Sequence, residues 1–167
     1  MEQIMVGTSR AVAIRASLFA AALVLMAGLS RAADTPAVEP AADKLSQARS
    51  HIQAKRWSAA IEELKRVNAS ASADWNNLMG YSLRKQATPD LDGAERFYNE
   101  ALRIDPRHRG ALEYSGELYL MKGDLARAEQ RLAALDKACT FGCEEYTDLK
   151  NAVARFKAAG NKFVAAP

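Results

Sequence analysis

Histidine and cysteine are scarce in this sequence, which has two of each among its 167 residues. His51 and His108 are far apart, and neither has a Cys, Asp or Glu partner at a metal-ligand spacing such as HExxH. Cys139 and Cys143 with one distant histidine would still leave a four-ligand zinc site one ligand short. We therefore expect no metal site.

The recognised catalytic and phosphate-binding motifs are also missing. The sequence has no GxSxG, no Walker loop and no glycine-rich phosphate fingerprint. The adjacent pairs Glu62–Glu63 and Glu144–Glu145 would point to different sides of a helix, which favours solvated surfaces over paired acid and base. These absences predict no catalytic residues, no cofactor, no small-molecule substrate and no enzyme activity.

Long apolar runs are absent apart from one near the N-terminus. Residues 16–29 carry no charge, but this run of 14 is shorter than the ~20 residues that a membrane-spanning helix needs. Arg10 and Arg15 precede it and small residues follow it, which is the layout of a secretory signal peptide. An uncleaved membrane anchor is the alternative.

Cleavage after Ala32 would place Ser30 and Ala32 at the two small-residue positions of the signal-peptide site. We therefore expect residues 1–32 to be a signal peptide and the protein to be exported, in a bacterial periplasm. The proline- and alanine-containing residues 33–42 read as a flexible leader, and residues 160–167 as a loose tail.

A strong net charge is absent as well. The whole chain has 23 basic and 20 acidic side chains, and removing residues 1–32 leaves 20 and 19. A nearly neutral mature protein gives no electrostatic reason to expect a nucleic acid or an anionic membrane as its partner. We expect no stable membrane insertion after signal cleavage.

A repeat is present in the middle of the chain. The stretch "GYSLRKQATPDLDGAERFYNEALRIDP" from Gly80 is similar to "GELYLMKGDLARAEQRLAALDKA" from Gly116, and "ARSHIQAKRWSAAIEELKRV" from Ala48 is a weaker copy. Small residues at matching places allow two antiparallel helices to approach closely. One such set recurs every 34 residues, at Ala60, Ala94 and Ala128.

Each copy also has the apolar pattern of a second helix. Asp90 and Asp124 stand where helix N-caps are expected, and Pro106 ends the second helix of the middle copy. The second helix of each copy begins with a large apolar residue, which is Trp57, Leu91 or Leu125. The buried face of that helix continues seven residues later, at Leu64, Tyr98 and Leu132, and three residues after that, at Val67, Ala101 and Leu135.

This 34-residue helix–turn–helix unit resembles the tetratricopeptide repeat, most closely in "GDLARAE" and "FYNEALRIDP". It departs from the repeat at Lys55, where a turn glycine is usual, and at the inserted Ala87–Thr88. The resemblance implies an all-α fold, a right-handed α-solenoid of about three repeats spanning residues 43–142. The expected repeats are about 43–72, 73–108 and 109–142.

A last helix is expected at residues 143–159. Its apolar residues, Tyr146, Leu149, Val153 and Phe156, are spaced to lie on one face. Repeat arrays need such a helix to cover the exposed side of the last repeat, so we interpret it as a C-terminal capping helix.

Cys139 and Cys143 are expected to form a disulfide. An exported protein meets an oxidising compartment, and the glycine between them lets the chain bring two Cα atoms within the ~6 Å that a disulfide requires. The bridge would fix the angle of the capping helix. Free thiols and a redox-active pair are the alternatives, although thiol oxidoreductases place two residues between their cysteines. With its "FGCEEY" segment, the chain also resembles small exported bacterial repeat proteins.

The resemblance to tetratricopeptide repeats implies a concave groove, lined by the first helix of each pair, that holds a peptide of another protein. The carboxylate clamp of that family does not fit, because its positions here are Leu45, Leu78, Gly110 and Tyr114. The expected partner-binding residues are Arg49, Asn77, Tyr81, Arg84, Lys85, Glu113 and Glu117, with Leu45, Ile52 and Leu120 beside them.

The sequence thus predicts a non-enzymatic periplasmic adaptor or scaffold that binds a peptide segment of a partner protein. The alternative is a thiol-redox or enzyme-accessory protein that uses Cys139 and Cys143.

Overall fold

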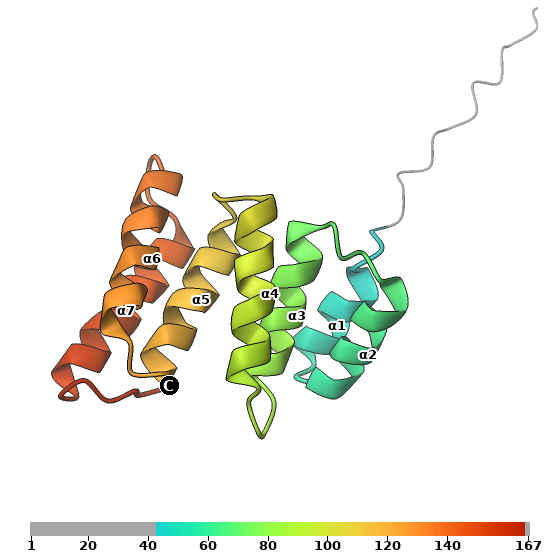
Figure 1. Ribbon diagram of the computed structural model, residues 1–167, viewed down its shortest axis with the longest axis horizontal. Coiled ribbons are helices and arrows are strands. Elements are labelled where there is room, and N and C mark those ends of the chain that lie inside the picture. The colour runs from blue at the N-terminus through green and yellow to red at the C-terminus, as the bar shows by residue number, and fades with distance from the viewer. Residues whose placement is uncertain (1–42, 166–167) are drawn as a thin grey trace, which may run out of the picture. The chain divides into compact units, whose positions relative to one another are not determined.

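The structure is a computed structural model that describes residues 43–165. In that range the chain forms α-helices and no β-strand (Figure 1). The predicted signal peptide and leader, residues 1–42, lie outside the described residues. The all-α prediction is confirmed. The helices are α1 (Ser46–Gln53), α2 (Trp57–Val67), α3 (Ala73–Arg84), α4 (Leu91–Ile104), α5 (Arg109–Met121), α6 (Leu125–Ala138) and α7 (Glu144–Ala158).

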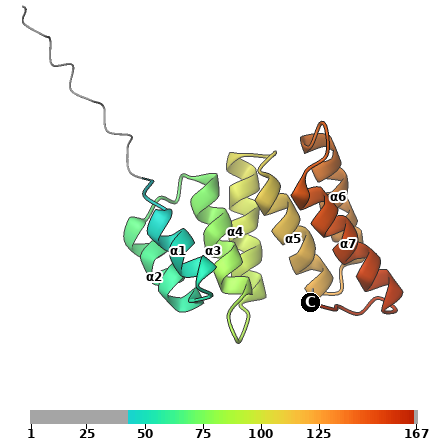
Figure 2. The ribbon, with the colours of Figure 1, turned by 180° about the vertical axis from the view of Figure 1, so that it is seen from behind.

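The helices form three pairs, α1 with α2, α3 with α4 and α5 with α6, and α7 packs on both α5 and α6. The backbones of the first helices α1, α3 and α5 approach one another in order, whereas those of α2, α4 and α6 do not, and α4 meets α6 through side chains. Closer spacing of the first helices curves the array toward their side. Figures 1 and 2 show the array from opposite sides.

Small residues allow this close packing, as the repeat predicted. A Cβ atom on Gly80 would lie 2.8 Å from Cε1 of Tyr98, and one on Gly116 would lie 2.5 Å from Cδ2 of Leu149. Gly80 therefore faces the second helix of its own pair, while Gly116 faces the capping helix α7. The three recurring alanines, Ala60, Ala94 and Ala128, are fully buried, and so is Ala48 of α1.

Side chains cap most of these helices. The predicted caps are confirmed, because the Asp90 carboxylate accepts from the Gly93 amide at 2.8 Å and the Asp124 carboxylate from the Arg127 amide at 3.0 Å. His108, which the sequence interpretation left without a role, caps α5 by accepting from the Ala111 amide at 3.1 Å. Such a bond satisfies an otherwise free amide at the start of a helix.

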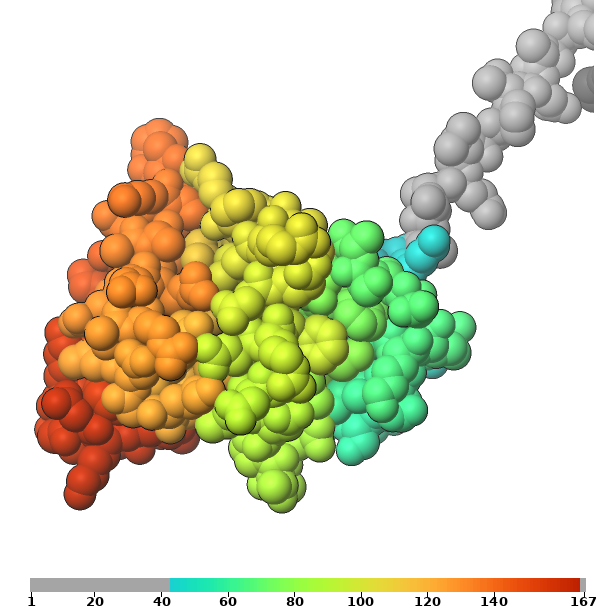
Figure 3. Space-filling view, in the orientation of Figure 1, coloured from blue at the N-terminus to red at the C-terminus, as the bar shows by residue number. Residues whose placement is uncertain are grey.

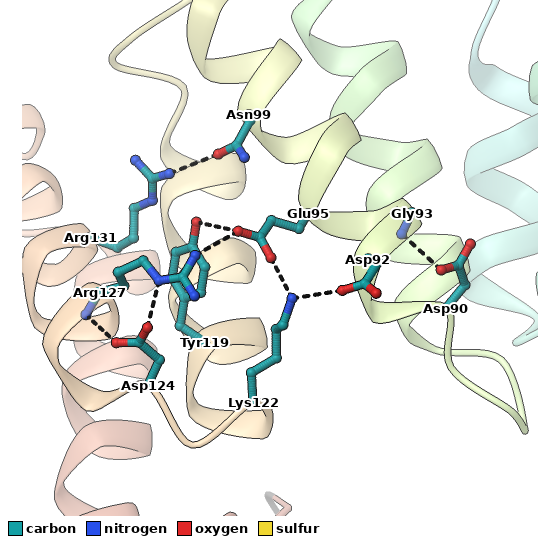
Figure 4. Close-up of polar contacts among 10 residues, drawn as sticks. All are labelled: Asp90, Asp92, Gly93, Glu95, Asn99, Tyr119, Lys122, Asp124, Arg127 and Arg131. Atoms are coloured by element: carbon teal, nitrogen blue, oxygen red, sulfur yellow. Dashed lines mark hydrogen bonds and ion pairs between the residues drawn. The ribbon is translucent and has the colours of Figure 1, made fainter.

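A polar network joins the second pair to the third (Figure 4). The Glu95 carboxylate of α4 accepts from Lys122 Nζ at 2.6 Å, from Arg127 Nη1 at 2.7 Å and from the Tyr119 hydroxyl at 3.3 Å. Arg127 also lies 4.3 Å from the centre of the Tyr119 ring. Since Lys122 and Arg127 flank the α5–α6 turn, this network fixes the turn against α4.

A disulfide joins the last two helices. Cys139 ends α6 and Cys143 precedes α7, and their Cα atoms lie 5.7 Å apart across the bridge. The short loop that it closes presents Phe141, which is fully exposed. The bridge stands where the sequence places a staple for the capping helix.

We expect the native protein to resist alkylation of Cys139 and Cys143 until it is reduced. Mass spectrometry should then show two added alkyl groups after reduction and none before, and two alkylated thiols in unreduced protein would contradict the bridge. The Cys139→Ser variant should lose about 2 kcal/mol or less of stability, because the closed loop is short. A thiol-exchange activity lost with this variant would instead favour the redox alternative.

Candidate functional site

Two tyrosines from consecutive first helices lie against each other. The ring centres of Tyr81 (α3) and Tyr114 (α5) are 4.6 Å apart, and Trp57 of α2 lies edge-on to Tyr81 at 5.9 Å. All three are half-buried. We call this surface, with the charged residues Arg84, Lys85, Glu113 and Glu117 around the two tyrosines, the tyrosine face.

Arg84 is the buried charge of the tyrosine face, with only 5% of its surface exposed. Its Nη2 lies 2.8 Å from Glu117 Oε2, and its Nε donates to the Tyr98 hydroxyl at 3.3 Å. Burial by itself would lower the pKa of Arg84, but Tyr98 and Glu117 raise it above its ordinary value. The guanidinium therefore stays charged and holds α3, α4 and α5 together.

Glu113 is the second buried ionisable group of the tyrosine face, and it is not paired. It is 7% exposed, and no residue from 43 to 165 gives its carboxylate a hydrogen bond or an ion pair. Burial raises the pKa of Glu113 to about 8, and the acids Glu117, Asp148 and Glu145 add to the shift while Arg84 opposes it. At neutral pH this side chain is therefore mainly protonated.

Lys85 is exposed, and its Nζ lies 5.8 Å from the centre of the Tyr81 ring. Asn77 lies one turn before Tyr81 on α3, is 7% exposed, and has its Oδ1 sealed from solvent without a partner in the described region. Its Nδ2 is 3.0 Å from where a Cβ on Gly110 would stand.

Arg49 lies away from the two tyrosines. Its guanidinium contacts Asp43 at 3.5 Å and Asp74 at 3.0 Å, and Asp74 also bonds Nε2 of His108 at 2.9 Å. The His108 bond, followed by Arg49, holds the pKa of Asp74 below its ordinary value against the effect of burial. Asp74 stands at the start of α3, two turns before Tyr81.

The structure thus brings together Tyr81, Arg84, Lys85, Glu113 and Glu117, and their part in binding stays a prediction. The expectation that Leu45 and Leu120 line the groove is wrong, because both side chains pack within the buried apolar clusters of the core. Ile52 is half-buried. Leu120 belongs to the apolar cluster that α5 forms with its neighbouring helices, α7 included, which the repeat phase alone does not indicate.

A separate depression of about 510 Å³ lies between α2 and α4. Its floor is formed by Trp75, Met79 and Leu83 of α3, and Phe97 of α4 meets Trp75 edge-on at 5.8 Å. Figure 3 shows this side of the array, with α4 in yellow-green beside α2 in blue-green. The sequence interpretation missed this depression, because it treated the second helices only as packing elements.

Within residues 43–165 there is no group of three or more His, Cys, Asp or Glu side chains placed to hold a metal ion. The described helices are each too short or too polar to cross a bilayer.

Comparison with known proteins agrees with the helix pairs. Residues 89–153 match the sequence model of the tetratricopeptide repeat. The structure is similar to that of the Yersinia enterocolitica type III secretion translocator chaperone SycD, with a TM-score of 0.61 and 18% identity over 70% of this chain and 83% of that one.

A second SycD structure, in complex with a peptide of the translocator YopD, gives a TM-score of 0.57 and 19% identity over 70% of this chain and 88% of that one. No curated protein matches the sequence significantly. The described region therefore has the tetratricopeptide-repeat fold, and its residues 89–153 match the sequence model of that repeat.

Proposed function

We propose that this protein is a non-enzymatic periplasmic adaptor, which binds a peptide segment of a partner protein on the face lined by α1, α3 and α5. The observation that carries the proposal is the Tyr81–Tyr114 pair, in which two half-buried aromatic rings from consecutive first helices meet at the surface. Aromatic side chains dominate binding hot spots because they bury a large area at a small cost in conformational entropy.

The similar SycD structure that includes a YopD peptide supports a peptide as the kind of partner. The periplasmic location rests on the predicted signal peptide and on the Cys139–Cys143 bridge, since disulfides persist in oxidising compartments. Three repeats offer a limited contact area, so we expect micromolar affinity for a short peptide.

Electrostatics of the tyrosine face would orient the peptide. Arg84 and Glu117 neutralise each other at its centre. Lys85 then remains as the exposed positive charge beside Tyr81. On the other side, Glu145 and Asp148 of α7 act on Glu113, and we call the part of the tyrosine face around Glu113 its acidic end. A peptide with an acidic and a basic end would bind in one direction on such a surface.

We expect a pull-down from periplasmic extract with full-length protein to recover partners that the Tyr81→Ala and Lys85→Glu variants lose. Lys65→Glu is the matched control, because Lys65 is an exposed lysine of α2 that lines the depression on the other side. Arg84→Glu is unsuitable, because a buried arginine affects folding as well as binding.

Retention of the same partners by both tyrosine-face variants would contradict the proposal. Loss of partners with Lys65→Glu instead would assign binding to the depression between α2 and α4.

A further inference from the structure

We propose that the acidic end of the tyrosine face is a subsite for one cationic group of the bound segment, a lysine or arginine side chain, which pairs with the Glu113 carboxylate beside the Tyr81 and Tyr114 rings. The inference rests on the proposed peptide-binding function and adds to it the chemistry of one recognised residue.

The first support is the unsatisfied state of Glu113. A buried carboxyl group normally has a hydrogen-bonding partner, and this one has none among residues 43–165. It is nevertheless within reach of a ligand. The described polar atoms that are both sealed from solvent and unpartnered are His51 Nδ1, Asn77 Oδ1, Arg131 Nε and Arg155 Nε, so the Glu113 oxygens are not sealed.

The second support is the balance of charge around Glu113. Arg84 is occupied by Glu117 and Tyr98, and Arg109 lies 3.6 Å from Glu145. Glu113 therefore faces an excess of acids without a free base. The charged and titratable groups that face it are Tyr81 and Arg84 from α3, Tyr114 and Glu117 from α5, and Glu145 and Asp148 from α7.

The third support is the pair of aromatic rings near Glu113. The faces of tyrosine rings attract cations, and Tyr81 and Tyr114 meet at the edge of the acidic region. Arg84 already lies 5.5 Å from the centre of the Tyr81 ring and 5.6 Å from that of Tyr114, so the cation of a ligand would join an existing cation–aromatic cluster. The unpaired Glu113 carboxylate and the acids around it suit a cation, and they disfavour the carboxylate that a clamp of lysines would hold.

Binding should be linked to proton release. The pKa of Glu113, raised to about 8 mainly by burial, leaves the carboxyl group protonated in the free protein at neutral pH. A cation beside the group favours its ionised form, so the proton leaves as the ligand binds. Affinity should therefore rise by up to about tenfold per pH unit below pH 8 and level off above it.

The test uses blocked single amino acids as probes, so that it does not depend on knowing the partner. Nα-acetyl-lysine methylamide and its uncharged analogue, Nα-acetyl-norleucine methylamide, are titrated into the full chain from pH 6 to pH 9. NMR signals of the Glu113 carboxyl carbon and of the two tyrosine rings are followed. The variants are Glu113→Gln and, as an exposed control from the first turn of α7, Glu144→Gln.

We expect the lysine probe to bind at least about tenfold more tightly than the norleucine probe at pH 8, and its affinity to fall as the pH is lowered. Glu113→Gln should remove both the preference and the pH dependence, while Glu144→Gln keeps them. If Glu113→Gln fails to fold, the pH dependence and the carboxyl-carbon shift of the wild type decide the question.

Equal binding of the two probes, or no binding of either, overturns the inference. The proposed function is judged separately by the pull-down, where dependence on Tyr81 can persist without any lysine preference. Binding of the lysine probe without a shift at Glu113 would also overturn the assignment of the subsite.

Discussion

Glu113→Gln should stabilise the protein against urea by about 2–4 kcal/mol at pH 9 and leave its stability nearly unchanged at pH 4. The wild-type carboxyl group must ionise in a buried, acid-lined position, where its pKa is about 8 instead of the ordinary 4.5. Glutamine has nearly the same shape and cannot ionise. The largest gain is therefore expected at high pH.

The direction of this pH effect follows from proton binding. Below pH 4.5 Glu113 is protonated in both the folded and the unfolded chain, so it contributes no difference. Between pH 4.5 and 8 the folded chain keeps the proton that the unfolded chain has lost, so wild-type stability falls as pH rises. Above pH 8 both are ionised, and the full penalty of the buried charge applies.

The quantity to compare is the difference between the variant and the wild type at each pH. Glu95 and Asp124 have pKa values below the ordinary range, held there mainly by bonds from Lys122 and Arg127 that outweigh burial. They make both proteins less stable in acid, and the subtraction removes their effect. A difference that stays constant from pH 4 to pH 9 would show that Glu113 is not a buried, unpaired acid.

Arg84→Met should destabilise the protein by about 2–4 kcal/mol in urea unfolding at pH 7. The substitution keeps the apolar part of the side chain but leaves Glu117 and the Tyr98 hydroxyl without their partner. Tyr98 is fully buried, whereas Glu117 is 24% exposed and can recover some hydration. The expected loss is therefore below the largest values seen for broken buried pairs.

Arg103→Met is the matched control, because Arg103 also pairs with a glutamate, Glu100, at 2.7 Å, but is 71% exposed. Exposed ion pairs of this kind contribute little, so we expect a loss of about 0.5 kcal/mol or less. Similar losses for the two variants would mean that Arg84 is not the buried link between α3, α4 and α5.

The fold could be predicted from sequence because its determinants are local and periodic. Small residues every 34 positions, apolar residues at the starts of the second helices, and the caps Asp90 and Asp124 each act within one or two turns. Their positions matched the structure, including the fully buried Ala60, Ala94 and Ala128.

The electrostatic state of the site could not be predicted in the same way. Arg84 and Glu113 were expected at the surface of a groove, as polar residues of first helices usually are. Arg84 is buried because Tyr98 of α4 and Glu117 of α5 meet it from two other helices. Glu113 is buried, and its pKa depends on Arg84 of α3, 29 positions before it, and on Glu145 and Asp148 of α7, 32 and 35 positions after it.

The position of α7 had the largest effect on the candidate site. A capping helix was expected from its apolar spacing, but the spacing does not say which helix it would cover. Leu149 of α7 packs on Gly116 of α5, which brings Glu145 and Asp148 toward Glu113. The acidic end of the tyrosine face exists because of this contact between two segments.

The central claim, that the face of α1, α3 and α5 binds a partner peptide, is tested most directly by site-specific photo-cross-linking. A photoreactive phenylalanine analogue replaces Tyr81 in the full-length protein, and the same analogue replaces Phe97, which lines the depression on the other side. After irradiation in the periplasm, the account predicts a covalent adduct with a partner protein from position 81 and none from position 97. Adducts from position 97 alone, or from neither position while the pull-down still recovers partners, would contradict it.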